Sequence, residues 1–192
     1  MWGRWFCERC NNATGRWDEE YLRWIEDLFP ALNDTRLPGD RLEISSTQLD
    51  PGAFARCLWA WMFALSDDLR GHQPAVAASV LSGDPVEPPR NHRLMLAATR
   101  ELQSAIFVLS FSVNVTAPPF VASLVYAPIA ERLKRELGST GFEALTDVSG
   151  WLRLPARTLH AVKVELQVVH TFEGGDLPPI GLPIFDQRLG LA

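Results

Sequence analysis

Residues 50–65 read DPGAFARCLWAWMFAL, and the rest of the fold is interpreted outward from this stretch. Asp50 is a typical helix N-cap, and Pro51 occupies the first helical position, where its missing N–H costs nothing. An apolar stripe then recurs at helical spacing, and most of the residues between its members are apolar too. The stretch therefore predicts a central buried helix whose stripe is Phe54, Cys57, Leu58, Trp61 and Leu65.

One further helix is expected before this one and another after it. Asp18 is a plausible N-cap for a helix over 18–29, with acidic residues in its first turn and Pro30 at its end. We extend the central helix over 51–69 and place a short helix over 74–82, after Pro74 and before Gly83. Residues 33–46 are interpreted as a polar connection.

The second half of the chain has a different pattern. Residues 105–115 and 120–126 are rich in β-branched and aromatic side chains, which favour strands. A short helix is expected over 129–137, and residues 160–169 alternate as a half-buried strand does. The predicted fold class is α+β, with N-terminal helices (about 18–29, 51–69 and 74–82) packed on a mostly antiparallel sheet from the C-terminal half.

Composition excludes several classes of protein. The chain has 192 residues, 47% of them hydrophobic and 21% charged, which is typical of a folded globular domain. A net charge of -5 gives no general attraction to nucleic acid or to anionic membranes. Three cysteines, no signal peptide and no apolar run long enough for a bilayer predict a cytoplasmic protein without a membrane partner. We expect most of the seven tryptophans to be core residues.

Cys7 and Cys10 form the motif that has the clearest chemical meaning. A Cys-x-x-Cys at a turn can direct two thiolates at one zinc ion, and structural zinc takes four ligands. Zinc is therefore the expected cofactor, with Cys7 and Cys10 as its ligands. The remaining candidate ligands are scattered along the sequence: Cys57, His72, His92, His160 and His170. We interpret Cys57 as a small core residue.

The string Cys7-Glu8-Arg9-Cys10-Asn11-Asn12-Ala13-Thr14-Gly15, followed by a predicted helix, resembles the C-terminal part of an HNH-type (ββα-metal) nuclease module. The resemblance covers fifteen to twenty residues, and its motif positions are Asn11 and Gly15. The resemblance implies that Cys7 and Cys10 are the second of two zinc knuckles, the first being upstream. By family alone it also implies a nucleic-acid partner. The region from Asp50 onward resembles bacterial proteins that follow such a knuckle, and no activity comes with that resemblance.

The chain departs from the family before Cys7. The six residues there contain neither cysteine nor histidine, so the first knuckle and the histidine that acts as general base in the family have no counterpart in this chain. Removing a general base lowers a rate by about a hundred- to ten-thousandfold. We therefore expect no catalytic residues, and a truncated or degenerate HNH-type protein without activity. Codons upstream of Met1 would encode the missing parts if the reading frame begins earlier.

The alternative interpretation is an intracellular interaction or structural domain with no nucleic-acid role. Residues 1–29 are interpreted as a knuckle-and-helix remnant and residues 30–192 as an α+β body that forms one compact unit with it. A homo-oligomer, or an upstream segment, would cover Trp2 and Trp5. The paired carboxylates Glu19/Glu20 and Asp67/Asp68 stand at helix ends, where solvated charge is the ordinary explanation.

Overall fold

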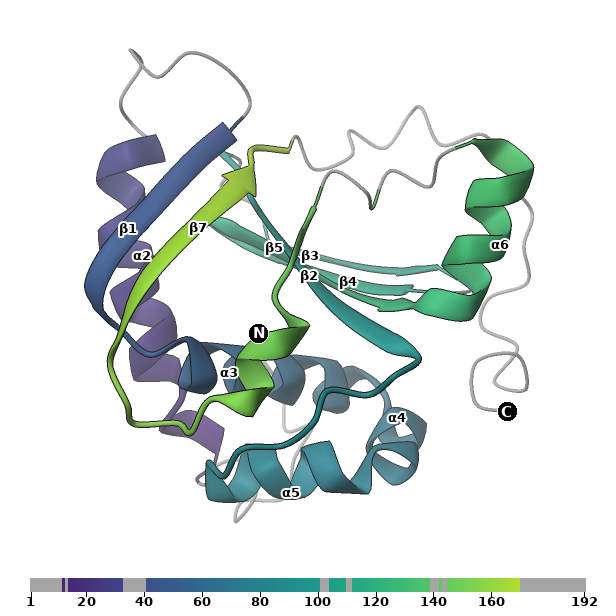
Figure 1. Ribbon diagram of the computed structural model, residues 1–192, viewed down its shortest axis with the longest axis horizontal. Helices are drawn as coiled ribbons and strands as arrows, with labels where there is room; N and C mark the ends of the chain where they lie inside the picture. Colours follow the sequence, from purple (N-terminus) through teal and green to yellow (C-terminus); the bar gives the residue numbers. More distant parts are fainter. Residues whose placement is uncertain are drawn as a thin grey trace. The chain divides into compact units, whose positions relative to one another are not determined.

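The computed structural model describes residues 12, 14–32, 41–100, 104–109, 112–138, 142 and 145–169 (Figure 1). Their contacts divide the chain into two compact units. Unit 1 comprises Met1–Pro30, Ile44–Pro89 and Val148–Val164, and unit 2 comprises Ala31–Glu43, Arg90–Asp147 and Glu165–Ala192. The interpretation of residues 1–29 as the remnant of another module stays a prediction.

Helix α3 (Pro51–Leu65) is the centre of unit 1, as the sequence predicts. The Asp50 side chain caps it by accepting a hydrogen bond from the Ala53 amide at 2.8 Å. Twelve of its residues are buried, and it packs against α4, α5 and η2 (Figure 1). The helix expected over 51–69 is interrupted at Ser66, because the Ser66 hydroxyl accepts from the Leu69 amide and starts a new helix.

Three further helices of unit 1 are short. They are α4 (Asp67–His72), α5 (Pro74–Ser82) and the 3-10 helix η2 (Ser149–Arg153). Helix α5 has the predicted bounds and ends at Gly83, whose φ of 92° is the left-handed conformation that glycine adopts readily.

Helix α2 (Asp18–Leu32) begins where the sequence predicts but continues past Pro30 to Leu32. Proline lacks its own N–H and its ring crowds the carbonyl four residues earlier, but the amides that follow it can still donate, so the last turn can continue. Trp24 stacks on Phe54 of α3, with ring centroids 4.4 Å apart, and lies 5.1 Å from Trp151 of η2. Trp17, Trp24 and Trp59 are buried core residues, as expected.

Arg56 is fully buried on α3 and connects three segments of unit 1. Its guanidinium donates hydrogen bonds to five main-chain carbonyls, on α3 itself, on α5 and the loop after it, and on η2 and the residues that follow. The acceptors are Gly52, Ser79, Asp84, Leu152 and Leu154. Burial lowers the pKa of Arg56, an effect that the carboxylates of Asp50 and Asp84 oppose.

Unit 2 contains a five-stranded antiparallel sheet in the order β3-β4-β5-β2-β6. Strands β4 and β5 form a hairpin in which Ala117 pairs with Phe120 across Pro118-Pro119. The strand predicted over 105–115 is two strands, because the chain reverses between Leu109 and Ser112. The strands are β2 (His92–Ala98), β3 (Ala105–Leu109), β4 (Ser112–Ala117), β5 (Phe120–Tyr126) and β6 (Thr146–Asp147).

Helix α6 (Ala127–Leu137) follows β5 directly and ends at Gly138, which has a φ of 83°. It matches the helix predicted over 129–137, two residues longer at its start. None of the helices in the described ranges is both long and apolar enough to cross a bilayer.

A second, two-stranded sheet pairs β1 (Arg41–Leu49) with β7 (His160–Gln167). The boundary between the two units falls within both strands. The predicted alternation of β7 is confirmed, since Val162, Val164 and Leu166 are buried. The prediction of a polar connection over 33–46 is wrong from Arg41 onward, because Leu42 and Ile44 alternate with exposed residues as in a strand. The α+β fold class is confirmed.

Candidate functional site

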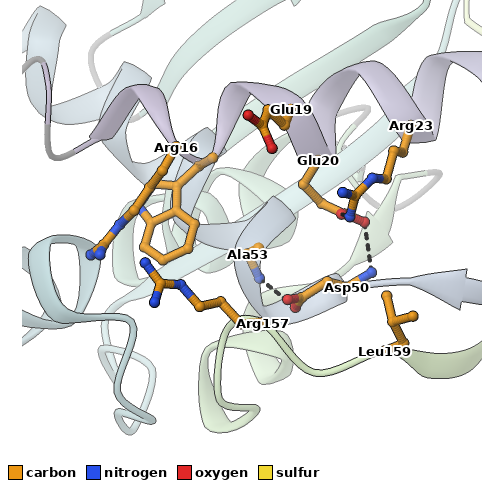
Figure 2. Close-up of a pocket in the computed structure, with 9 residues that line it drawn as sticks. Arg16, Glu19, Glu20, Arg23, Asp50, Ala53, Arg157 and Leu159 are labelled. Carbon is orange, nitrogen blue, oxygen red and sulfur yellow. Dashed lines mark hydrogen bonds and ion pairs between the residues drawn. The ribbon is translucent and has the colours of Figure 1, made fainter.

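A pocket of about 410 Å³ lies within unit 1 (Figure 2). Three segments build it: the residues just before α2 with its first turns, the N-cap and first turn of α3, and the residues after η2. Its lining contains three arginines and three carboxylates, so the formal charge of the lining is balanced. The residues are Arg16, Trp17, Glu19, Glu20, Arg23, Asp50, Ala53, Arg157 and Leu159.

Glu20 is a buried carboxylate, 3% exposed, that holds α2 to the start of α3. Its Oε1 accepts hydrogen bonds from the Asp50 amide at 2.6 Å and from Trp24 Nε1 at 3.1 Å. Its Oε2 pairs with Arg23 Nη1 at 3.0 Å. Burial raises the pKa of Glu20, while the Asp50 amide and the Arg23 guanidinium act in the opposite direction.

Asp50 is the second buried carboxylate, and both of its oxygens accept from the main chain. Oδ1 accepts from the Ala53 amide at 2.8 Å, and Oδ2 accepts from the Thr158 amide at 3.0 Å. These bonds fix the start of α3 to the segment that carries Arg157. Dashed lines in Figure 2 mark the bonds of Asp50 to Ala53 and to Glu20. The carboxylates therefore fix the pocket's framework.

Two arginines occupy the other side of the pocket. The Arg16 guanidinium lies over the Trp17 ring, 4.2 Å from its centroid, and Nη2 donates to the Leu81 carbonyl. Figure 2 shows the guanidinium groups of Arg16 and Arg157 facing one another. Burial and repulsion by Arg157 lower the pKa of Arg16. The structure thus brings two like charges together on one side of the pocket.

The residues of the predicted zinc knuckle cannot be compared with this pocket. Cys7, Cys10 and Asn11, like Trp2 and Trp5, lie outside the described residues. Gly15 is described and is helical, immediately before Arg16 of the pocket. The zinc prediction and the motif therefore stay predictions.

The other candidate ligands are separated. Cys57 is buried in α3, as expected of a core residue, with Sγ 3.8 Å from Asp18 Oδ1; burial and that carboxylate raise the pKa of its thiol. His72 ends α4, and its Nδ1 lies 2.8 Å from the Asp68 carbonyl oxygen. His92 and His160 begin strands β2 and β7, and His170 is outside the described residues. Within the described ranges, no three histidine, cysteine or acidic side chains are grouped as a metal site.

Sequence reasoning missed the pocket and misjudged one of its residues. Glu20 was expected to be solvated, but it is buried because the Asp50 amide and two α2 side chains satisfy its oxygens. Its spacing to Arg23 and Trp24, three and four residues on, was the available signal for the contacts within α2. Arg157 carries no such signal, because its neighbours come from distant segments.

The chain was compared with known protein families, curated proteins and solved structures, and no match was found in any of the three.

Proposed function

We propose that this protein acts by binding and not by catalysis. The observation that supports this is the engagement of both buried carboxylates of the pocket. Glu20 and Asp50 accept hydrogen bonds from the main-chain amides of Asp50, Ala53 and Thr158. A carboxylate that acts as general acid or base must reach a proton on its substrate. Carboxylates that hold the framework together in this way are suited to shaping a binding pocket.

We also propose that the chain is a catalytically inactive relative of HNH-type modules. Support comes from the Cys-x-x-Cys-Asn string of residues 7–11 and from α2, which begins at Asp18 as the resemblance implies. In that family a histidine activates water against a phosphodiester, and the quoted motif here lacks this histidine.

A plasmid-cleavage assay tests the absence of catalysis. Supercoiled plasmid is incubated with the purified chain and Mg²⁺, Mn²⁺ or Zn²⁺ in turn, beside the double variant Cys7→Ser/Cys10→Ser. We expect both proteins to leave the plasmid uncut. Nicking that co-purifies with the wild-type chain and disappears in the double variant would contradict the proposal.

Zinc content tests the kinship separately. If Cys7 and Cys10 hold zinc, the purified chain contains the metal and the double variant does not. Less than about a tenth of an equivalent of zinc in the wild-type chain removes the metal from the proposal. An interaction domain without a nucleic-acid role is then favoured, and a duplex that fails to bind at low salt, where phosphate contacts are strongest, supports it further.

A further inference from the structure

Arg157 is a cation without an acceptor in the described part of the chain. No hydrogen bond or ion pair of its guanidinium is formed with a described residue, although three carboxylates line the same pocket. Among the described residues, Arg16 donates only to the neutral Leu81 carbonyl, and its buried Nε has no hydrogen-bond partner there. The guanidinium groups of Arg16 and Arg157 thus lie near one another, and both keep N–H donors that no described residue accepts.

The backbone at Arg157 adds an independent observation. Its φ is 67°, in the left-handed region that side chains other than glycine avoid because Cβ crowds the carbonyl. Among the residues that the structure describes, it is the only one besides glycine with a positive φ. Such conformations concentrate at ligand-binding positions, where the placement of a side chain matters. Here the conformation places a guanidinium opposite Arg16 (Figure 2).

We propose that this pocket binds the phosphate group of a small phosphate monoester between Arg16 and Arg157. Two guanidinium groups carry two charges, which a phosphate monoester matches and a carboxylate does not. Each planar guanidinium can donate two parallel hydrogen bonds to phosphate oxygens. The proposal does not depend on the HNH kinship or on zinc.

The rest of the pocket indicates what the phosphate is attached to. The volume of about 410 Å³ exceeds what a lone phosphate needs. Glu19 is exposed on the same lining and can accept hydrogen bonds from hydroxyl or amino groups. Leu159, 56% exposed, offers an apolar contact. A small hydroxylated phosphate, such as a sugar phosphate, fits these features.

The same lining disfavours a nucleic-acid strand. The phosphates adjacent to a bound one would approach Glu19, Glu20 and Asp50, which balance the arginines in formal charge. The net charge of -5 adds general repulsion to a polyanion. A single compact phosphate can occupy the arginine side of the pocket alone.

The central experiment compares wild-type chain with Arg157→Gly. Glycine adopts a φ of 67° more readily than arginine, so this variant keeps or raises the melting temperature while it removes one cation. At about pH 8, inorganic phosphate should raise the wild-type melting temperature by about 2–4 °C beyond sodium chloride of equal ionic strength. The variant should lose this rise, and titration calorimetry should show at least about tenfold weaker phosphate binding.

A matched control is Arg153→Gln. Arg153 is an exposed arginine of the same unit that pairs with Glu87 and does not line the pocket. Its variant should bind phosphate within about twofold of wild type, because a remote exposed charge contributes little. Ribose 5-phosphate should bind more tightly than inorganic phosphate, and acetate more weakly.

Three outcomes would overturn the proposal. In the first, phosphate does no more than sodium chloride of equal ionic strength. In the second, Arg157→Gly binds phosphate as well as wild type does, or Arg153→Gln weakens phosphate binding as much as Arg157→Gly does. Either result would mean that Arg157 makes no specific contribution beyond general charge. In the third, acetate matches phosphate or a short duplex displaces ribose 5-phosphate, so that the site selects neither a dianion nor a small molecule.

Discussion

Arg56 shows how a single side chain can organise a unit. It is a buried cation whose hydrogen bonds all go to main-chain carbonyls, which lie on the separate segments that meet at α3. Replacing it by leucine keeps much of the apolar stem but removes a charged donor from all five carbonyls. The carbonyls of Ser79, Asp84 and Leu152 each keep one other donor, whereas the side-chain donor to the Leu154 carbonyl is lost. We expect Arg56→Leu to lower the free energy of unfolding by about 3–5 kcal/mol, measured by urea denaturation.

Arg153→Leu is the matched control for Arg56, because its side chain is 57% exposed and pairs with Glu87 on the surface. This substitution should change stability by less than about 1 kcal/mol. Equal losses for the two variants would show that the hydrogen bonds of Arg56 do not stabilise the fold. Arg56→Lys should also be costly, since an ammonium has only three donors for five carbonyls.

Individual residues of the pocket were the least predictable part of the molecule. Asp50 was identified from its sequence position, because capping is a local property of an Asp-Pro pair. The second hydrogen bond of Asp50, to the Thr158 amide, depends on a segment far along the chain. Glu20 accepts from the Asp50 amide in the same long-range way, and Arg157 lies near Arg16 from a segment far along the chain, so no local pattern encodes either role.

At the scale of elements, the close approach of α3 to the chain after η2 depends on Gly52. A Cβ added there would lie 2.8 Å from the Leu154 carbonyl oxygen and 2.9 Å from that of Pro155. We expect Gly52→Ala to destabilise the protein by about 1–3 kcal/mol in thermal unfolding, although alanine favours helix more than glycine does.

Gly71 of α4 provides the opposite case for the same substitution. A Cβ added there meets nothing within 4 Å. Gly71→Ala should therefore stabilise the protein by about 0.5–1 kcal/mol, because only the helix preference changes. A destabilising Gly71→Ala together with a neutral Gly52→Ala would contradict the packing described for α3.

Elements were predictable where their signals were local. Helices α3 and α5 carry Asp-Pro and Pro starts, and β7 alternates without interruption. Strand β1 was missed because the polar run Ser45-Ser46-Thr47-Gln48 interrupts its alternation, so that only pairing with β7 marks it as a strand. Strand β2 is nearly all buried and has no alternation to detect.

For the molecule as a whole, His92 gives stability a pH dependence. It is 8% exposed at the start of β2, and burial lowers its pKa to about 4. Between pH values of about 6.5, the pKa of an unfolded histidine, and about 4, His92 binds a proton more readily in the unfolded chain than in the folded one. Stability should therefore fall by up to about 3 kcal/mol as the pH drops from about 6.5 to 4.

The measurement is the urea midpoint of wild type and of His92→Leu across this pH range. Burial also raises the pKa values of Asp18 and Glu20, which favours the folded state as the pH falls. These groups are common to both proteins, so the difference between the two curves isolates His92. Parallel curves would show that His92 does not control the pH dependence.

The overall class of fold was within reach of the sequence, and the division into units was not. Helical patterns precede strand patterns along the chain, and the α+β class follows from that order. The grouping of residues 148–164 with the helices depends on contacts such as those of Arg56 with Leu152 and Leu154. Such contacts join positions that periodicity treats as unrelated.

Both units are assembled from three separate stretches of chain, and this has a consequence for biosynthesis. A ribosome that has released residues 1–89 has made the helices α2 to α5 but not η2, whose carbonyls accept from Arg56. Unit 1 is complete only when residue 164 has emerged, after all five strands of the sheet of unit 2 have been made. We therefore expect nascent chains halted before that point to be cut readily by protease, and full-length released chains to resist it.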